Sequence, residues 1–197
     1  MTAASKRQSV YEQFLAAPPT QMAEIVNGTV RVQPRPASPH ARAASRLGAR
    51  LGPFDPGDGG DGPGGWAILD EPELRIGGHI VVPDLAGWRR ERMPEIPDVP
   101  FFELVPDWIC EVLSPSTAAL DRTEKAPIYA EWRVGHLWFL DPLVRTLEVL
   151  ALDHDTGQDT GHAQPAWRVL GASHGDVRVR AEPFEVLELN LAALWAR

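Results

Sequence analysis

The segment Trp108–Leu113 (WICEVL) constrains the fold more than any other stretch of the chain. Alternate residues of a strand point to opposite faces, and here both faces are apolar apart from one acid, Glu111. A strand that is apolar on both sides is buried between two layers. A buried carboxylate costs roughly several kcal/mol unless it is protonated, ion-paired or bound to a cation. Glu111 is therefore either half of a structural ion pair with an arginine or a metal ligand.

The composition is that of a globular protein and excludes several classes. The chain has 197 residues, 44% of them hydrophobic and 23% charged, which predicts a single domain over residues 1–197 with an adequate core. One cysteine, Cys110, excludes a cystine framework. No apolar run reaches the roughly 18 residues of a membrane span, and the first residues lack an apolar signal core. We expect a cytoplasmic protein without membrane association.

The charge is unevenly distributed. A net charge of −8 argues against a general nucleic-acid coat, because attraction to phosphates dominates such binding, but it is compatible with a nuclease whose carboxylates bind metal ions. Residues 31–50 nevertheless hold five arginines and no acid. Arg42, Arg46 and Arg50 follow helical i, i+4 spacing and form an arginine stripe. The stripe predicts nucleic-acid binding through phosphates, while a subunit contact in a homodimer, or an ordinary exposed helix face, explains it equally well.

Periodicity and turn signals predict an α+β or mixed α/β fold. Asn27-Gly28 between two β-prone runs predicts a hairpin over Ala23–Val32. The predicted helices are Ser9–Ala16, Ser38 or Pro39 to Leu51, a segment within Leu120–Arg133, and Asn190–Ala196 with Asn190 as its N-cap. The predicted strands are Trp66–Ile76, His79–Ala86, Asp107–Leu113, His136–Leu140, Arg145–Leu150, Ala166–Leu170, Val177–Arg180 and Phe184–Val186. This order differs from a regular βαβ winding.

Two aspartate-rich segments are predicted to be loops rather than calcium sites. Gly52–Gly65 lacks the flanking helices and the closing glutamate of a calcium loop, so its Gly, Pro and Asp residues indicate a flexible loop. Asp153–His162 lies between strand-like runs and is predicted to be a hairpin tip.

A second acid is predicted to lie near Glu111. Proline cannot donate to a central ladder, so the strand that reaches Pro83 becomes irregular there. The next residue, Asp84, can then project into a cleft. An ordinary turn at the end of a strand is the alternative interpretation.

Lys125 is one of only two lysines in an arginine-rich chain, which suggests a need for a compact, titratable ammonium, although chance also explains it. If its segment is helical, Asp121, Lys125 and Tyr129 share a face. Pro127, however, fits only the first turn of a helix. We therefore expect the regular helix to begin near residues 123–124, with Asp121 ahead of it.

Taken in order, Pro83-Asp84, Glu111 and Lys125 resemble the PD-(D/E)XK restriction-endonuclease-like superfamily. More closely, the chain resembles the large bacterial family of "putative restriction endonuclease" domains of unknown function, from about Tyr11 to Trp195. The segments that carry the resemblance are Glu24-Ile25-Val26-Asn27-Gly28, Ser38-Pro39-His40, Val82-Pro83-Asp84, Glu111–Thr117 (EVLSPST), the Asp121/Lys125/Tyr129 helix and Gly135–Pro142 (GHLWFLDP). The superfamily motif places its lysine where this chain has Leu113. The resemblance implies that in this family the lysine lies on the following helix, here at Lys125.

The resemblance implies a restriction-endonuclease-like core, with a central mixed β-sheet flanked by helices and an N-terminal β-hairpin. It also implies a Mg²⁺-dependent endonuclease that hydrolyses phosphodiester bonds, with Mn²⁺ as a substitute metal. Asp84 and Glu111 would bind the metal together with the carbonyl of Val112, and Lys125 would orient or deprotonate the attacking water. Glu24 is a candidate outer ligand, and a surface acid at a strand edge is the equally open alternative.

The implied partner is nucleic acid, with DNA favoured over RNA. His40, in the acid-free segment, is a candidate phosphate contact, although a capping or surface histidine fits as well. Two other functions remain open. The first is a catalytically silent member of the family that acts as a binding or structural module, and the second, which ranks lower, is a Ser-His-Asp hydrolase.

Overall fold

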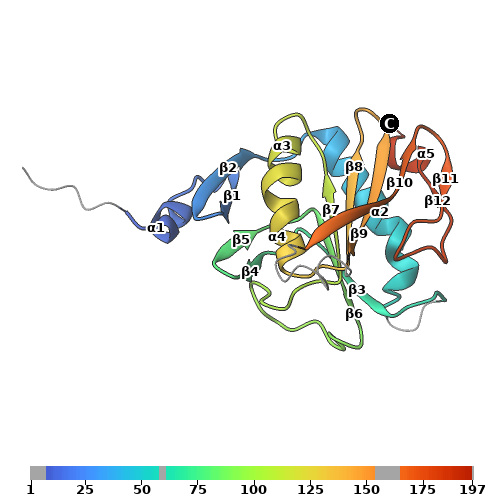
Figure 1. Cartoon of the computed structure of the whole chain (residues 1–197), viewed down its shortest axis with the longest axis horizontal. Helices are drawn as coiled ribbons and strands as arrows, with labels where there is room; N and C mark the ends of the chain where they lie inside the picture. Colours follow the sequence, from blue (N-terminus) through green and yellow to red (C-terminus); the bar gives the residue numbers. More distant parts are fainter. Residues whose placement is uncertain (1–7, 58–60, 154–164, 197) are drawn as a thin grey trace, which may run out of the picture.

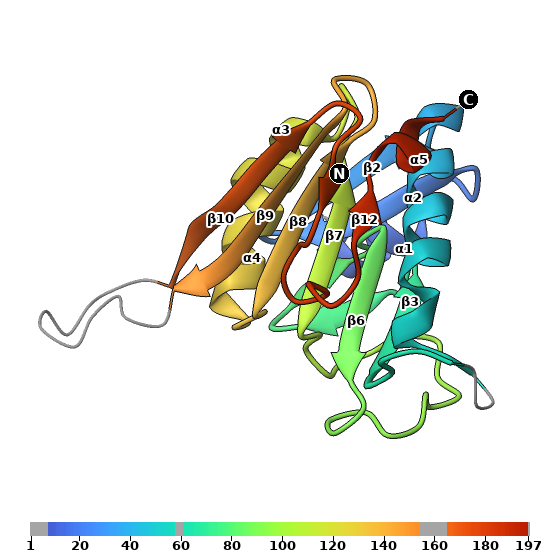
Figure 2. The same ribbon diagram turned by 90° about the vertical axis from the view of Figure 1, so that its right-hand side faces the viewer.

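The computed structural model describes residues 8–57, 61–153 and 165–196. At its centre lies a six-stranded sheet in the order β10-β9-β8-β7-β6-β3, seen face-on in Figure 2. The strands are β3 Trp66–Asp70, β6 Leu85–Arg89, β7 Trp108–Val112, β8 His136–Asp141, β9 Thr146–Asp153 and β10 Ala166–His174. Strands β7 and β8 are parallel and the other neighbours are antiparallel, so the central sheet is mixed, as predicted.

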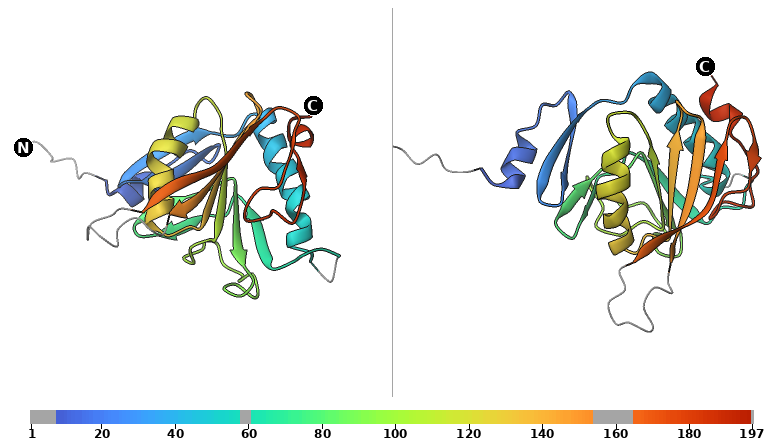
Figure 3. Two further views of the ribbon diagram at one scale, coloured as in Figure 1. Left: turned by 45° about the vertical axis from the view of Figure 1, so that its right-hand side comes forward. Right: turned by 45° about the horizontal axis from the view of Figure 1, so that its top comes forward.

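A second sheet, of four strands in the order β2-β1-β5-β4, contains the predicted hairpin. Its strands are β1 Gln21–Val26, β2 Thr29–Pro34, β4 Leu74–Ile76 and β5 His79–Val81. Asn27 and Gly28 have φ values of 50° and 68°, the left-handed conformation that a two-residue type I′ turn requires. Figure 3 shows the hairpin, preceded by α1 (Val10–Leu15), on the side of the molecule that carries α3 and α4.

Helices cover both faces of the central sheet (Figure 1). Helix α2 (Ser38–Leu51) packs Leu47 against the face of β7 that carries Trp108. Helix α4 (Ala126–Glu131) packs against the opposite face, which carries Ile109. Every residue of β7 is buried, which confirms the prediction from its sequence. The remaining elements are η1 Gly52–Phe54, α3 Ala118–Leu120, η2 Asp121–Lys125, β11 Arg178–Val179, β12 Leu189–Asn190 and α5 Ala192–Trp195.

The helical segment after β7 corrects our prediction of its start. It begins at Ala118 rather than near residues 123–124, and it contains a π turn, η2, so Asp121 lies within the helix. The N–H of Ala126 donates to the carbonyl of Asp121, which is the i→i−5 bond of a π turn. Pro127 follows directly. Because the wide turn shifts the preceding carbonyls away from their α-helical positions, it accommodates a proline that lacks an N–H.

Three predicted strands are also corrected. The runs 66–76 and 79–86 each divide between the two sheets, the second at Pro83-Asp84. Residues 184–186 form turns instead of a strand, because Phe184 and Leu187 donate their N–H groups to carbonyls three residues earlier. The predicted final helix begins at Ala192, and Asn190 lies in β12. Its side-chain oxygen still accepts a hydrogen bond from the N–H of Ala192, at 3.1 Å.

Each of the two aspartate-rich segments lies partly outside the described ranges. Asp55 pairs with Arg90 at 2.7 Å and accepts the N–H of Ile68, so it has a structural role. Residues 58–60, and residues 154–164 of the predicted hairpin tip, lie outside the described ranges, although β9 and β10 pair antiparallel on either side of the tip. No helix within the described ranges is long and apolar enough to cross a membrane.

Phe184→Ala should destabilise the protein by about 3–5 kcal/mol, because it opens a cavity in the core. The ring of Phe184 is 2% exposed and lies 4.7–5.7 Å, between centroids, from those of Phe54, Trp66, Trp108 and Trp138. Urea unfolding measures the change. The control Val186→Ala removes a side chain in the same turn that is 69% exposed, and should stay within about 0.5 kcal/mol of wild type. Equal effects of the two substitutions would contradict this description of the core.

Candidate active site

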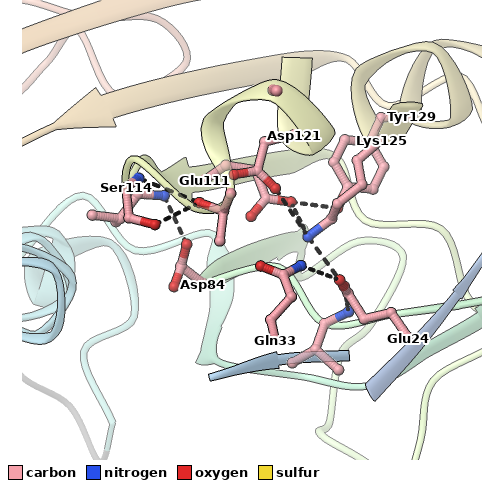
Figure 4. Close-up of polar contacts among 12 residues, drawn as sticks. Glu24, Gln33, Asp84, Glu111, Ser114, Asp121, Lys125 and Tyr129 are labelled. Carbon is pink, nitrogen blue, oxygen red and sulfur yellow. Dashed lines mark hydrogen bonds and ion pairs between the residues drawn. The ribbon is translucent and has the colours of Figure 1, made fainter. Parts of the chain in front are cut away.

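A pocket of about 270 Å³ lies between the N-terminal hairpin, the start of α2 and the helical segment α3–η2. Its polar lining comes from elements far apart in the sequence, and Figure 4 shows most of these side chains converging. The polar lining residues are Glu24 of β1, Gln33 of β2, Arg35 after β2, His40 of α2, Asp84 between β5 and β6, Glu111 of β7, Ser114, Ser116 and Thr117, and Asp121 and Lys125 of η2. The pocket opens where Pro83-Asp84 interrupts the strands, as expected for an irregular strand end.

The ammonium group of Lys125 is the centre of the pocket's polar contacts. Its Nζ lies 2.8 Å from Oε1 of Glu111, 3.1 Å from Oε1 of Glu24 and 3.6 Å from Oδ1 of Asp121. The four side chains are no more than 6% exposed. One lysine is therefore the shared cation of three buried carboxylates, those of Glu24, Glu111 and Asp121, which we call the acid cluster.

Two carboxylates of the acid cluster, those of Glu111 and Glu24, are held by further contacts. The hydroxyl of Tyr129 donates to Oε1 of Glu111 at 2.5 Å, so two donors converge on that one oxygen. The N–H of Val82 donates to Oε1 of Glu24 at 2.8 Å, and the side-chain amide of Gln33 lies 3.4 Å from the other oxygen of Glu24. These donors fix the orientation of Glu111 and Glu24 without a second charged partner.

Burial and mutual charge change the proton affinities within the cluster. Burial raises the pKa of Glu111 well above its usual value; Lys125 opposes this shift, and the charges of Asp121, Asp84 and Glu24 add to it. Burial also raises the pKa of Asp121, against the opposing charge of Lys125. Burial alone would lower the pKa of Lys125, but Glu111 and Glu24 outweigh it and the net pKa is raised well above its usual value. Lys125 therefore stays charged, while the acids outnumber their cation.

Asp84 is tied to the strand that carries Glu111. Its Oδ2 accepts the N–H of Val112 at 2.7 Å, and its Oδ1 lies 3.2 Å from Nε2 of His40. Burial lowers the pKa of His40, but the hydrogen bond and charge of Asp84 outweigh burial, and the net pKa is raised. The other ring nitrogen of His40, Nδ1, is buried without a hydrogen-bond partner within the described ranges.

The structure brings five of the sequence-predicted residues to one pocket: Glu24, His40, Asp84, Glu111 and Lys125. The alternatives that placed Glu24 and His40 on the surface are wrong, because these residues are 4% and 7% exposed. The ion-pair alternative for Glu111 is correct in kind, but its cation is Lys125 instead of an arginine, and Tyr129 adds a hydrogen bond.

The arginine stripe does not line this pocket. Arg42, Arg46 and Arg50 are exposed along α2, and Nε of Arg42 donates to the carbonyl of Ala196 at 3.1 Å. Arg31, from the same acid-free segment, pairs with Glu124 of η2. The local excess of positive charge in the sequence is therefore divided between two faces of the molecule.

Sequence reasoning left several lining residues without a role. Asp121 carries a signal, since it precedes Lys125 by one helical turn, but Pro127 led us to place it outside the helix. Gln33 carries no signal, because only the pairing of β2 with β1 brings it to Glu24. Ser114, Ser116 and Thr117 form a hydroxyl network with distances of 3.0–3.1 Å.

Residues 171–175 match the G-x-S-x-G spacing of a serine hydrolase, but residues 171–174 lie along strand β10 instead of at a strand-to-helix turn.

The donor chemistry of the pocket fits a divalent cation. Carboxylate oxygens are the ligands that Mg²⁺ prefers, and Asp84 and Glu111 present them to a common space. In the described ranges no group of three or more His, Cys, Asp or Glu side chains is already arranged to hold a metal ion. The carboxylates of Glu24, Glu111 and Asp121 are instead drawn toward Lys125.

A mixed sheet with helices on both faces and an acid-lined pocket at its irregular end defines a restriction-endonuclease-like fold. A solved structure described as a "putative nuclease belonging to DUF820 from Anabaena variabilis ATCC 29413" has a TM-score of 0.69 with this chain. The alignment covers 96% of this chain and 98% of that chain at 22% identity, which shows a common fold. No curated protein matches the chain.

The model of the Uma2 family, described as "Putative restriction endonuclease", matches residues 11–182. This range covers most of the chain, and the chain belongs to the Uma2 family. The resemblance inferred from the EVLSPST segment and its neighbours is thereby confirmed.

Lys125→Met should destabilise the protein by about 3–5 kcal/mol, because it leaves the buried acids without their cation. Adding Glu111→Gln to that variant should restore part of the loss, since one of the uncompensated acids is removed. Urea unfolding of the two single variants and the double variant gives the coupling energy. Arg178→Met is the matched control, because it breaks an exposed pair with Glu188 and should cost less than about 1 kcal/mol. Additive effects of Lys125→Met and Glu111→Gln would contradict the coupling.

Proposed function

We propose that the protein is a divalent-metal-dependent nuclease that hydrolyses phosphodiester bonds within nucleic acid, with DNA as the favoured substrate. The observation that carries the proposal is the convergence of Asp84, Glu111 and Lys125 in one pocket. The same three residues carry the sequence motif, and the chain belongs to a family described as "Putative restriction endonuclease". Enzymes of this fold generally use divalent metals.

In this proposal Asp84 and Glu111 hold Mg²⁺, or Mn²⁺ in its place, together with the carbonyl of Val112. The bond from the N–H of Val112 to Asp84 supports this grouping, because it fixes the aspartate beside the strand that supplies the other two ligands. Glu24 is an outer ligand that acts through water. When bound, the metal lowers the pKa of a coordinated water and offsets the charge of the scissile phosphate.

Lys125 has two functions in the proposal. Its ammonium orients the attacking water and stabilises the negative charge that develops on the phosphate. Before a cation binds, it offsets part of the charge of the acid cluster. Tyr129 acts through Glu111, because its hydroxyl occupies Oε1 and directs the carboxylate plane. Tyr129 is therefore a positioning residue.

One observation favours a second candidate function, a catalytically silent module that binds nucleic acid or another protein. Lys125 lies within ion-pair distance of three carboxylates, an arrangement that is structurally complete without a metal. A chain that had lost activity could keep this ion network for stability alone.

Purified protein should cleave a mixture of plasmid, linear and single-stranded DNA and RNA in the presence of Mg²⁺ or Mn²⁺, and EDTA should stop the reaction. Glu111→Gln and Asp84→Asn should each lower the rate at least about 100-fold, because each removes a charged ligand. Glu188→Gln is the control, because Glu188 is an exposed acid outside the pocket lining, and this substitution should leave the rate unchanged. The silent module is favoured if no substrate is cut by the wild type under any of these conditions.

Metal binding can be tested independently of activity. Mg²⁺ should raise the melting temperature of the wild type, since a cation relieves repulsion among the carboxylates. The double variant Asp84→Asn, Glu111→Gln should lose that shift. A shift of unchanged size in the double variant would place the ion elsewhere.

The arginine stripe is proposed to contact phosphates outside the pocket. Arg42→Ala with Arg46→Ala should weaken DNA binding and reduce its dependence on salt, because fewer counterions are released. Arg178→Ala is the control, as its side chain is exposed and paired with Glu188. If the stripe instead forms a subunit contact in a homodimer, the double variant will change the sedimentation coefficient and leave DNA affinity unaltered.

A further inference from the structure

We propose that a second cavity, at the start of α2, binds the sugar-phosphate backbone of the nucleic acid a few nucleotides from the scissile bond. This flanking cavity has a volume of about 760 Å³, and its lining includes Ser38, Pro39 and Arg42 of α2, Arg145 of the turn between β8 and β9, and Leu194 and Trp195 of α5. The inference rests on the proposed nuclease function and names the place that supplies affinity for the substrate.

The flanking cavity and the pocket of the acid cluster share the first turn of α2. Ala37 and His40 line the pocket of the acid cluster, whereas Ser38 and Pro39 line the flanking cavity. Figure 2 shows α5 beside this start of α2. A helix with its side chains is about 10–12 Å across. Because a strand advances about 3.4 Å of duplex axis per nucleotide, a strand with one phosphate in the first pocket reaches the flanking cavity within about three nucleotides.

The two cavities differ in charge. Four acidic and three basic side chains line the pocket of the acid cluster. The described residues that line the flanking cavity include two arginines, Arg42 and Arg145, and no acid. A phosphate is therefore repelled by the acid cluster until a cation binds there, but it is attracted to the flanking cavity with or without a cation. The flanking cavity can thus supply binding energy that the catalytic pocket lacks.

Both guanidinium groups are held in place and can still donate to a phosphate. Nε of Arg42 donates to the carbonyl of Ala196 at 3.1 Å. One terminal nitrogen of Arg145 lies 3.2 Å from Oδ1 of Asp176, and the two side chains of this pair are 48% and 58% exposed. Each contact uses a single nitrogen of a guanidinium that carries five N–H donors. Arginine suits phosphate because it can donate two parallel hydrogen bonds.

The backbone of the turn between β8 and β9 also favours a function for Arg145. Oδ1 of Asp141 accepts the N–H groups of Leu143 and Val144, at 2.9 and 3.1 Å, which fixes the turn. Arg145 ends the turn with a φ of 58°, in the left-handed region where glycine adopts the backbone at least cost. A large cationic side chain at such a position indicates that the side chain itself is used.

Trp195 gives the flanking cavity an apolar wall next to the cations. The ring is half-buried and packs against the core beside Leu194, which is fully buried. Its Nε1 donates to Oδ1 of Asp176 at 3.1 Å, the oxygen that also pairs with Arg145, so Asp176 positions the ring and the guanidinium together. An apolar wall beside two cations suits the sugar and the phosphate of a backbone unit. Such contacts set the register of a strand without reading its sequence, and they are accessible on the outside of a duplex.

Binding in EDTA tests the inference without any cleavage. The affinity for a fluorescently labelled DNA duplex is measured by anisotropy over a range of salt concentrations. Arg145→Gln should weaken binding at least about threefold and lower the slope of log affinity against log salt by about 1, because one phosphate contact is lost. Arg178→Gln is the matched control, since Arg178 is also an exposed arginine paired with an acid but lies outside this lining. Unchanged affinity and slope in Arg145→Gln would overturn the inference.

Two further variants separate a binding role from a structural one. Asp176→Asn should tighten binding by up to about threefold, because it removes a negative charge beside the phosphate while its amide oxygen can still accept the N–H of Trp195. Trp195→Leu should weaken binding without changing the salt slope, because it removes the apolar wall and no charge. A structural effect alone would not tighten binding, so weaker binding by Asp176→Asn would count against the inference. Trp195→Leu with wild-type affinity would exclude the sugar contact.

Cleavage kinetics separate failure of this inference from failure of the proposed function. In Mn²⁺, Arg145→Gln should raise the half-saturating DNA concentration by a larger factor than it lowers the maximal rate, because the flanking cavity does not touch the scissile phosphate. The opposite split would contradict the inference. If the wild type cuts no substrate, the nuclease proposal fails, and the affinities in EDTA still decide whether the flanking cavity binds the backbone.

Discussion

The ion pair between Lys125 and Glu111 is the contact on which the arrangement of the pocket depends. It joins η2 to the central strand of the sheet at 2.8 Å, and the same ammonium reaches Glu24 on the hairpin. Three separate parts of the chain are thus held around one buried charge. Because burying a single ion without partners is costly, each part needs the others in place. The position of the N-terminal hairpin over the sheet is in this sense set by electrostatics as well as by packing.

Two breaks in regular structure provide the space for this arrangement. Pro83 ends β5 before β6 begins, and the carboxylate of Asp84 turns back to accept the N–H of Val112. On the opposite side, the π turn η2 places Asp121 and Lys125 on the pocket face ahead of Pro127. A regular strand or helix at either point would have paired its backbone groups with its neighbours. Irregular turns of this kind are common at functional sites.

The parts of the structure that the sequence predicts are those governed by local rules. The hairpin follows from Asn27-Gly28, the two-sided burial of β7 from its apolar run, and helix α2 from its periodicity. The parts that it does not predict depend on distant contacts. Phe184 packs among four aromatic rings from distant segments, and Gln33 reaches the site through strand register. The function of the site residues remains a proposal from motif order, whereas their convergence is observed.

The charge of the pocket explains why the proposed reaction needs a metal before a substrate. Glu24, Asp84, Glu111 and Asp121 line the pocket together with Arg35, His40 and Lys125, so the acidic side chains outnumber the basic ones. In a poorly hydrated space such an excess repels a phosphodiester strongly, because the interaction is screened less than in water. A divalent cation held by the carboxylates reverses the sign of the local field. Binding of cation and substrate is then necessarily cooperative, since each ion makes the site more favourable for the other.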